Sequence, residues 1–215
     1  RNGFTRPLKM SLETRLDALS HPSWMMGYLR QGMPMIKNWL PYAKDGATAD
    51  DVANLVTAQV TAPLTWDNIA RYRDLWPRNL VIKGIMHVDD AVKAAEVGVD
   101  GIVVSNHGAR QLDRSPASLE VLPGIVAAVG DRLTVMLDSG VQRGSDIVTA
   151  LCLGAKFVFT GRATLYGLTA GGKPGAAKAI GILNNEVDLV MAQMGAANIA
   201  ALGEEFIYKP LPRNY

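Results

Sequence analysis

From residue 80 onward the chain alternates short apolar runs with helical patterns, and this alternation constrains the fold more than any other feature. The apolar runs occupy residues 80–85, 101–106, 133–140 and 156–162, and the helical pattern after the last run continues to about Gly195. Short runs rich in Val and Ile that alternate with helices are typical of βα units and a parallel sheet. The sequence therefore predicts an α/β protein.

Two α/β architectures fit this pattern. An open doubly wound sheet could be complete with four strands, whereas a (β/α)₈ barrel needs eight strands and about 250 residues. The first 80 residues do not supply four more strands, because residues 49–76 look helical with a break at "TAPLTW". Periodicity alone therefore slightly favours the open sheet. N-caps of the later helices are predicted at Asp89, Ser115 and Ser145.

Composition excludes several classes of function. The net charge of +2 gives no support for nucleic-acid binding, and no His, Cys, Asp and Glu set has metal-ligand spacing. The single cysteine, Cys152, cannot form an internal disulfide, which fits a reducing compartment. The chain opens on Arg1 without a Met, so we expect a segment upstream of it.

Polar and glycine residues follow each predicted strand. They are, in chain order, Lys83; Ser105, His107 and Arg110; Asp138, Ser139, Gly140, Gln142 and Arg143; and Gly161 and Arg162. Strands of a parallel sheet end at the same edge, where ligands bind. A lysine, a histidine and several arginines at one edge therefore predict a binding site for an anionic ligand.

The last two strand ends carry a predicted phosphate site. "DSGVQRG" (138–144) and "TGR" (160–162) are glycine-containing turns that open helices. Such turns direct backbone N–H groups and the positive end of a helix dipole at an anion. In (β/α)₈ barrels this site usually follows strands 7 and 8, which would place Lys83 on strand 5 and His107 after strand 6.

Four motifs carry a resemblance to a known family. In this order and spacing, "VIKGI", "GIVVSNHGARQLD", "LDSGVQRGSDIVTALCLGA" and "GRATLYGL" resemble the FMN-dependent (S)-2-hydroxy acid oxidases and dehydrogenases, over about residues 49–195. The resemblance implies a (β/α)₈ TIM barrel with FMN at its mouth. This chain would supply strands 5–8 as residues 49–215, and a variable loop after strand 4 as residues 1–48. The partners implied are the amino-terminal half of the barrel and further copies in a homotetramer.

The resemblance also implies a role for each site residue. His107 would be the catalytic base, and Arg110 would bind the substrate carboxylate. Lys83 would lie beside the N1 and C2 carbonyl of the flavin. The remaining residues would bind FMN, the last four toward its phosphate: Ser105, Asp138, Ser139, Gly140, Gln142, Arg143, Gly161 and Arg162. Gln142 occupies a position where the family often has an arginine. The Asp that orients the catalytic His in the family would lie upstream of this chain. Asp113 could orient Arg110 or cap a turn.

The chemistry of these residue types agrees with that reading. Oxidation of a 2-hydroxy acid removes an α-proton and an electron pair, and a neutral imidazole can accept the proton. A guanidinium can hold the carboxylate with two hydrogen bonds. The resemblance, which is greatest to the mandelate dehydrogenases of this family, implies that (S)-mandelate is oxidised to benzoylformate, with electrons passed to a membrane quinone. The alternatives are an L-lactate dehydrogenase, a soluble oxidase that uses O₂, and a non-catalytic phosphate-binding module.

Residues 20–44 form a segment of unusual composition. It contains two of the four Trp and four of the nine Met, with Arg30, Lys37 and Lys44 spaced seven apart, so that they would share a face on one helix. Pro34 and Pro41 should break such a helix. The composition suits a membrane-interfacial segment, or else a loop packed against the barrel or another subunit. The segment and "GRATLYGL" resemble membrane-associated mandelate dehydrogenases. The expected location is cytoplasmic, peripheral on the inner face of the cell membrane.

Overall fold

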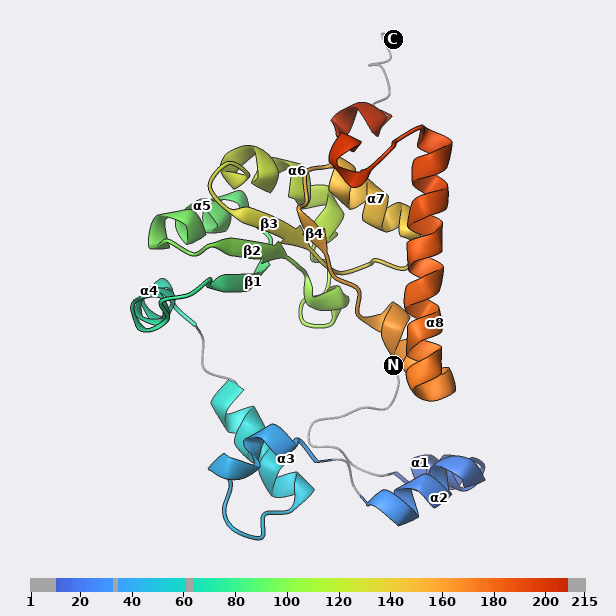
Figure 1. Cartoon of the computed structure of the whole chain (residues 1–215). Coiled ribbons are helices and arrows are strands. Elements are labelled where there is room, and N and C mark those ends of the chain that lie inside the picture. The colour runs from blue at the N-terminus through green and yellow to red at the C-terminus, as the bar shows by residue number, and fades with distance from the viewer. Residues whose placement is uncertain (1–10, 33–34, 61–63, 209–215) are drawn as a thin grey trace. The chain divides into compact units, whose positions relative to one another are not determined.

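The computed structural model describes residues 11–32, 35–60 and 64–208, and the chain divides into two compact units between Leu64 and Thr65. The first unit contains α1 (Leu12–Leu19), α2 (Pro22–Gln31), the 3₁₀ helix η1 (Lys37–Tyr42) and α3 (Ala49–Val60) (Figure 1). Arg30, Lys37 and Lys44 fall in α2, in η1 and in the loop before α3, so they share no helix. Pro41 lies inside η1, and Pro34 lies outside the described residues.

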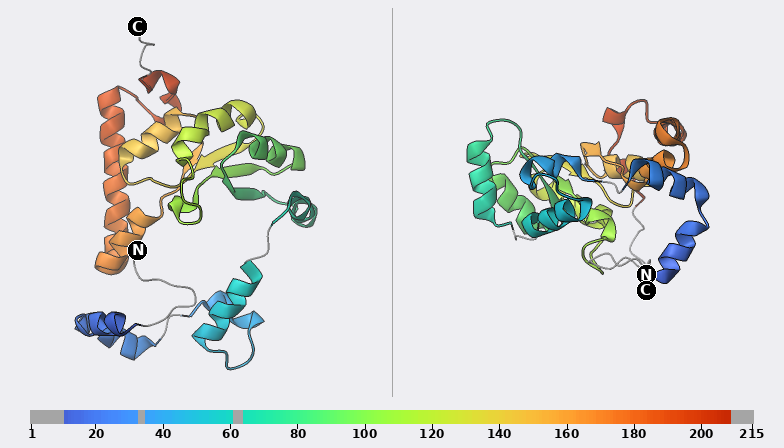
Figure 2. Two further views of the ribbon diagram at one scale, coloured as in Figure 1. Left: turned by 180° about the vertical axis from the view of Figure 1, so that it is seen from behind. Right: turned by 90° about the horizontal axis from the view of Figure 1, so that it is seen from below.

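The second unit contains the four predicted βα units. Its elements are α4 (Trp66–Leu75), β1 (Val81–Ile85), α5 (Val88–Val97), β2 (Gly101–Val104), η2 (His107–Ala109), α6 (Ser118–Val129), β3 (Thr134–Leu137), α7 (Gly144–Cys152), β4 (Phe157–Val158), α8 (Arg162–Met194), η3 (Ile199–Ala201) and η4 (Glu204–Phe206). The helical prediction for residues 49–76 is also confirmed by α3 and α4. Helix α8 is kinked at Gly171 and Gly172, and its long second part runs beside α7 (Figure 2).

The prediction that Asp89, Ser115 and Ser145 are N-caps is wrong. His87 caps α5, where its Nδ1 accepts a hydrogen bond from the Asp89 N–H at 3.2 Å. Helices α6 and α7 follow Ala117 and Arg143, which have no capping oxygen in their side chains. An acidic side chain in each first turn reaches back instead. Glu120 accepts from the Ala117 N–H at 2.8 Å, and Asp146 accepts from the Arg143 N–H at 2.9 Å.

The sheet is parallel, and its strands follow chain order, β1-β2-β3-β4. One face forms the core with α5, α6 and α7. Its strand residues Ile102, Val104, Val135 and Leu137 are buried together with Ala91, Ala94, Leu122, Ile125, Val129 and Ala150 from these helices. A doubly wound sheet reverses its strand order and carries helices on both faces. Sequential strands with helices on one shared face instead follow the winding of a (β/α)₈ barrel, so the preference for an open sheet from periodicity alone is wrong.

The register places a row of residues on the other face of the sheet. Lys83 is paired with Val103, Val103 with Met136, and Met136 with Phe157. Val103 and Met136 are buried at the centre of the row, whereas Phe157 is exposed. A register shift after Lys83, where Gly84 has a φ of +99°, bends the end of β1. The face opposite the helices therefore carries the lysine of the predicted site.

The close approach of α7 and α8 gives a test of this packing. A Cβ at Gly144 would lie 2.4 Å from Glu186 Cβ and 2.5 Å from the Val187 nitrogen. We expect Gly144→Ala to lower the free energy of unfolding by about 2 kcal/mol, because the helices would have to separate. Gly181→Ala is the matched control, since nothing lies within 4 Å of its added Cβ, and it should stabilise α8 by up to about 1 kcal/mol. Urea unfolding measures both. Equal effects of the two substitutions would contradict the close approach.

Candidate active site

A hollow of about 430 Å³ lies where the strand ends and the starts of the following helices come together. It is lined by Lys83, His107, Gly108, Arg110, Asp138, Ser139, Gly140, Val141, Gln142, Phe159, Gly161, Arg162, Ala163 and Tyr166. Most of the predicted site residues are in this set, although they come from four separate βα units. Of the predicted site residues, Ser105 and Arg143 do not belong to the lining.

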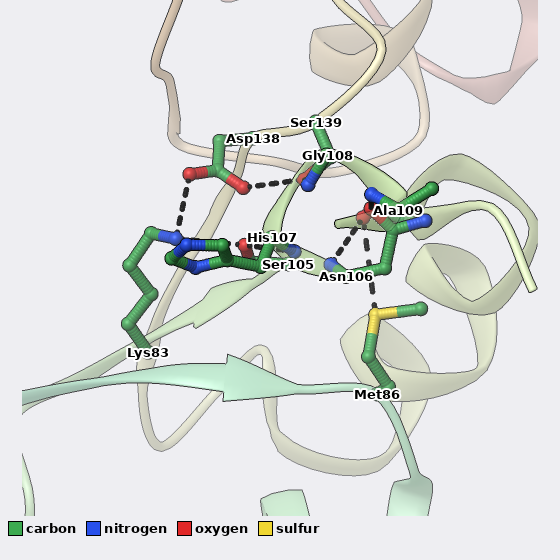
Figure 3. A network of polar contacts seen from close by, with 10 residues as sticks. Lys83, Met86, Ser105, Asn106, His107, Gly108, Ala109, Asp138 and Ser139 are labelled. Atoms are coloured by element: carbon green, nitrogen blue, oxygen red, sulfur yellow. Dashed lines mark hydrogen bonds and ion pairs between the residues drawn. The ribbon is translucent and has the colours of Figure 1, made fainter. Parts of the chain in front are cut away.

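An ion pair joins two lining residues of the hollow, Lys83 on β1 and Asp138 directly after β3 (Figure 3). Lys83 Nζ lies 3.0 Å from Asp138 Oδ2 and donates a hydrogen bond to Ser105 Oγ at 2.9 Å. Ser105, directly after β2, is buried and only 2% exposed. Ser105 therefore lies behind the lining and supports it.

Asp138 is held as a carboxylate. Its partial burial would raise the pKa, but hydrogen bonds from Ser105, Lys83 and Ser139, together with the Lys83 charge, lower the pKa below the ordinary value of 3.8. The side chain of Asp138 is 19% exposed and that of Lys83 46% exposed. The carboxylate is the less exposed partner, and its three donors more than offset the effect of its partial burial on the pKa.

His107 lies on a left-handed turn. The φ angles of His107, Gly108 and Ala109 are +58°, +67° and +57°, a conformation that residues with a Cβ adopt at a cost. Arg110 follows with an ordinary negative φ. The side chains of His107 and Arg110 are exposed and line the same hollow. The turn thus brings an imidazole and a guanidinium to one cavity.

The two turns predicted to bind phosphate contain Arg143 and Arg162, and only Arg162 lines the hollow. Arg162, at the start of α8, packs against the His107 turn, since a Cβ at Gly108 would lie 3.1 Å from an Arg162 guanidinium nitrogen. Arg143 instead pairs with Glu186 of α8 through two contacts of 2.8 Å, from Nε and Nη2. Gln142, the residue beside it, does line the hollow.

Several lining residues were missed by the sequence reasoning, the main ones being Phe159 and Tyr166. Phe159 lies two residues before Gly161 and packs edge-on against Phe157, with 4.9 Å between ring centroids. Tyr166 lies four residues after Arg162 on α8, and helical spacing from that arginine could have identified it. The carboxylate of Asp113 accepts a hydrogen bond from the Arg114 N–H at 3.2 Å, which favours the turn-capping interpretation of Asp113.

Comparison with known proteins identifies the chain. A family model described as FMN-dependent dehydrogenase matches residues 1–209. The chain belongs to the FMN-dependent dehydrogenase family. It is 39% identical to (S)-mandelate dehydrogenase from Pseudomonas putida over 96% of this chain and 51% of that protein. A putative L-lactate dehydrogenase from Mycobacterium tuberculosis is 38% identical over 96% of this chain and 49% of that protein.

A solved structure gives the same family. The crystal structure of the monotopic membrane protein (S)-mandelate dehydrogenase matches with a TM-score of 0.88 and 39% identity, over 95% of this chain and 54% of that one. The FMN-dependent dehydrogenases have the TIM-barrel fold, so that prediction is confirmed. The chain spans about half the length of the curated relatives it matches. In residues 11–32, 35–60 and 64–208, no helix is long and apolar enough to span a membrane.

The depressed pKa of Asp138 predicts how the stability of this family member responds to pH. Asp138→Asn should lower the free energy of unfolding at neutral pH by about 1 kcal/mol, a modest value because Lys83 is partly exposed. A carboxyl whose pKa is lowered by folding stabilises the protein above its unfolded pKa and loses that effect as pH falls through the folded one. The difference between wild type and variant should therefore be constant at neutral pH, begin to shrink as the pH approaches 3.8, and shrink further as the pH falls through the lower folded pKa. Urea unfolding across this range measures the difference, and a constant gap down to the lowest pH would contradict the assignment.

Proposed function

We propose that the protein containing this chain oxidises (S)-2-hydroxy acids to 2-oxo acids with FMN. The main support for the proposal is that one hollow is lined by a histidine and three cations: His107, Lys83, Arg110 and Arg162. A general base and a carboxylate-binding guanidinium are what this oxidation requires beside an electron acceptor. FMN, when bound, supplies that acceptor for the electron pair of the substrate.

The residues of the hollow fit FMN. Its volume lies in the range of cofactor sites, roughly 300–1,000 Å³, and its cations suit a phosphate. A Cβ added at Gly140 or Gly161 would meet open space, so a ligand could approach the backbone closely there. We assign FMN binding to Lys83, Asp138, Ser139, Gly140, Gln142, Gly161 and Arg162, with Ser105 in support. A direct role for Arg143 stays a prediction, because its side chain is paired with Glu186.

Two side chains of this chain act on the substrate in the proposed reaction, Arg110 and His107. Arg110 binds the substrate carboxylate through two parallel N–H groups, which fixes the orientation of the α-carbon. An imidazole nitrogen of His107 accepts the proton from that α-carbon, and the electron pair left behind would pass to FMN when it is bound. The hydroxyl proton would be released to solvent as the carbonyl forms. Lys83, held at Asp138, keeps a positive charge near the site of electron transfer.

The substrate we propose is (S)-mandelate. The proposal is supported by a TM-score of 0.88 to a mandelate dehydrogenase structure that covers 95% of this chain. L-Lactate is the second candidate, supported by 38% identity to a putative L-lactate dehydrogenase. Comparing the rates of flavin reduction by the two acids would separate them.

Substitution of the two reacting residues tests the proposed function. In the full-length protein we expect His107→Ala to slow flavin reduction by hydroxy acid by roughly 100-fold or more, since proton transfer loses its base. Arg110→Met should mainly raise the substrate concentration needed for half-maximal flavin reduction, because the substrate carboxylate loses its guanidinium partner. Stopped-flow absorbance of the flavin measures both effects. Normal reduction in either variant would sink the assignment.

Matched controls lie outside the hollow. His87→Ala removes a histidine that caps α5, and Arg71→Met removes an exposed arginine of α4. Both should reduce flavin at the wild-type rate, although loss of the cap should lower stability by about 1 kcal/mol.

We also propose that the first unit contacts a membrane, on the inner face of the cell membrane, where a quinone accepts the electrons. The described surface of residues 20–44 exposes Trp24, Met26, Leu29 and Tyr42, which are 54%, 52%, 71% and 76% exposed. Trp24 stacks on Tyr28, with 5.5 Å between ring centroids. Aromatic and aliphatic side chains beside Arg30, Lys37 and Lys44 suit an interface with anionic lipid.

Membrane partition tests this segment. Trp24→Ser with Leu29→Ser should lower binding to vesicles of anionic phospholipid by roughly tenfold or more, because two apolar anchors are lost. Ile182→Ser with Leu189→Ser removes exposed apolar side chains from α8 and is the control. Vesicle co-sedimentation compares the pairs. An oxidase of the same family that uses O₂ would show equal partition for both, and oxygen consumption in place of quinone reduction.

A further inference from the structure

The turn that carries His107 adopts a conformation that needs outside support. Three consecutive residues, His107 to Ala109, have positive φ, and two of them have a Cβ. Residues with a Cβ keep a positive φ only where the surrounding structure holds the backbone in that conformation. Successive N–H groups in such a turn usually form a nest that can bind an anion. The partners of these N–H groups therefore decide what the turn does.

Side chains already accept hydrogen bonds from all three N–H groups of the turn. The His107 N–H donates to Ser105 Oγ at 3.2 Å, and the Ala109 N–H donates to Asn106 Oδ1 at 3.0 Å. The Gly108 N–H donates to Ser139 Oγ at 2.9 Å, across 31 residues of sequence. Two of these acceptors are local, whereas Ser139 belongs to the following βα unit. The turn is thus held by side chains and does not present a free nest.

Asp138 orients the two serine hydroxyls that hold the turn. Ser139 Oγ donates to Asp138 Oδ1 at 2.9 Å, and Ser105 also hydrogen-bonds to Asp138. With its proton directed at Asp138, the Ser139 hydroxyl keeps lone pairs for the Gly108 N–H. The carboxylate is fixed in turn by Lys83. A closed ring of hydrogen bonds therefore joins β1, the His107 turn and the turn after β3 (Figure 3).

We infer that Ser139 is a positioning residue for His107, acting through the amide of Gly108. Ser139 itself has a φ of +79°, which a glycine would adopt without strain. A serine here bears a conformational cost, and its hydroxyl makes two hydrogen bonds, to Gly108 and Asp138, that a glycine could not make. The inference rests on the proposed role of His107 as the base. Ser139 is also among the residues proposed to bind FMN. Loss of that contact would lower FMN affinity, whereas loss of support for the His107 turn would slow flavin reduction.

Two substitutions at Ser139 in the full-length protein separate the hydroxyl from the backbone strain. Ser139→Ala removes the hydroxyl and keeps the strain, whereas Ser139→Gly removes both. If the hydroxyl positions His107, both variants should reduce flavin roughly 10- to 100-fold more slowly at saturating hydroxy acid. Ser145→Ala, an exposed serine in the first turn of α7, is the control and should match wild type. A wild-type rate in Ser139→Gly would overturn the inference, because strain and not the hydroxyl would then matter.

Hydrogen–deuterium exchange gives a readout that does not depend on turnover. In both Ser139 variants, a peptide spanning residues 105–112 should exchange roughly tenfold faster at its protected amides, since the Gly108 N–H loses its acceptor. The FMN dissociation constant, measured by quenching of FMN fluorescence, should change by less than the rate of flavin reduction. Unchanged exchange, or a loss confined to FMN affinity, would overturn the inference. If the wild-type protein oxidises no hydroxy acid, the proposed function fails. Hydrogen–deuterium exchange would still test whether Ser139 supports the His107 turn.

Discussion

The ion pair between Lys83 and Asp138 connects the fold to the site, because Lys83 lies on β1 and Asp138 directly follows β3, and these two strands are not adjacent. Strand β2 lies between them, and its register with both neighbours sets the distance that the pair must span. Ser105, directly after β2, fills the space beneath the pair and bonds to both members. A shift of one residue in either pairing would turn Lys83 or the end of β3 to the other face. The core that fixes the register therefore also fixes the site.

That core lies on one face of the sheet, and this determines where chemistry can take place. Helices α5, α6 and α7 cover the face that carries Ile102 and Val135. Polar side chains that line a cavity must then come from the opposite face or from the strand ends. The row through Lys83, Val103 and Met136 supplies one cation beside two buried apolar residues. The Lys83 side chain is 46% exposed, so solvent screens part of its charge and its pairing with Asp138 fixes where that charge lies.

Local sequence patterns predict much of this architecture, and long-range pairing determines the rest. Apolar runs and helical spacing depend on neighbouring residues, so the four βα units and the residues at their ends could be predicted. The direction of the Arg143 side chain could not, because it depends on Glu186, 43 residues further along the chain. The support of the His107 turn by Ser139 spans 31 residues and was likewise missed. Periodicity alone also favoured the wrong sheet, since strand order is a long-range property.

The charges of the hollow divide into two classes with different roles. Lys83 is paired with Asp138, and Arg143 is paired with Glu186 outside the lining. Among the described residues, Arg110 and Arg162 have no ion-pair partner, and both line the hollow. In the proposed reaction two anions must bind together, a substrate carboxylate and a cofactor phosphate, and a guanidinium suits each. With Gln142 neutral, the phosphate depends on Arg162 and the start of α8. In this proposal the two arginines bind the anions, while the lysine and its carboxylate belong to the hydrogen-bonded ring that supports the His107 turn.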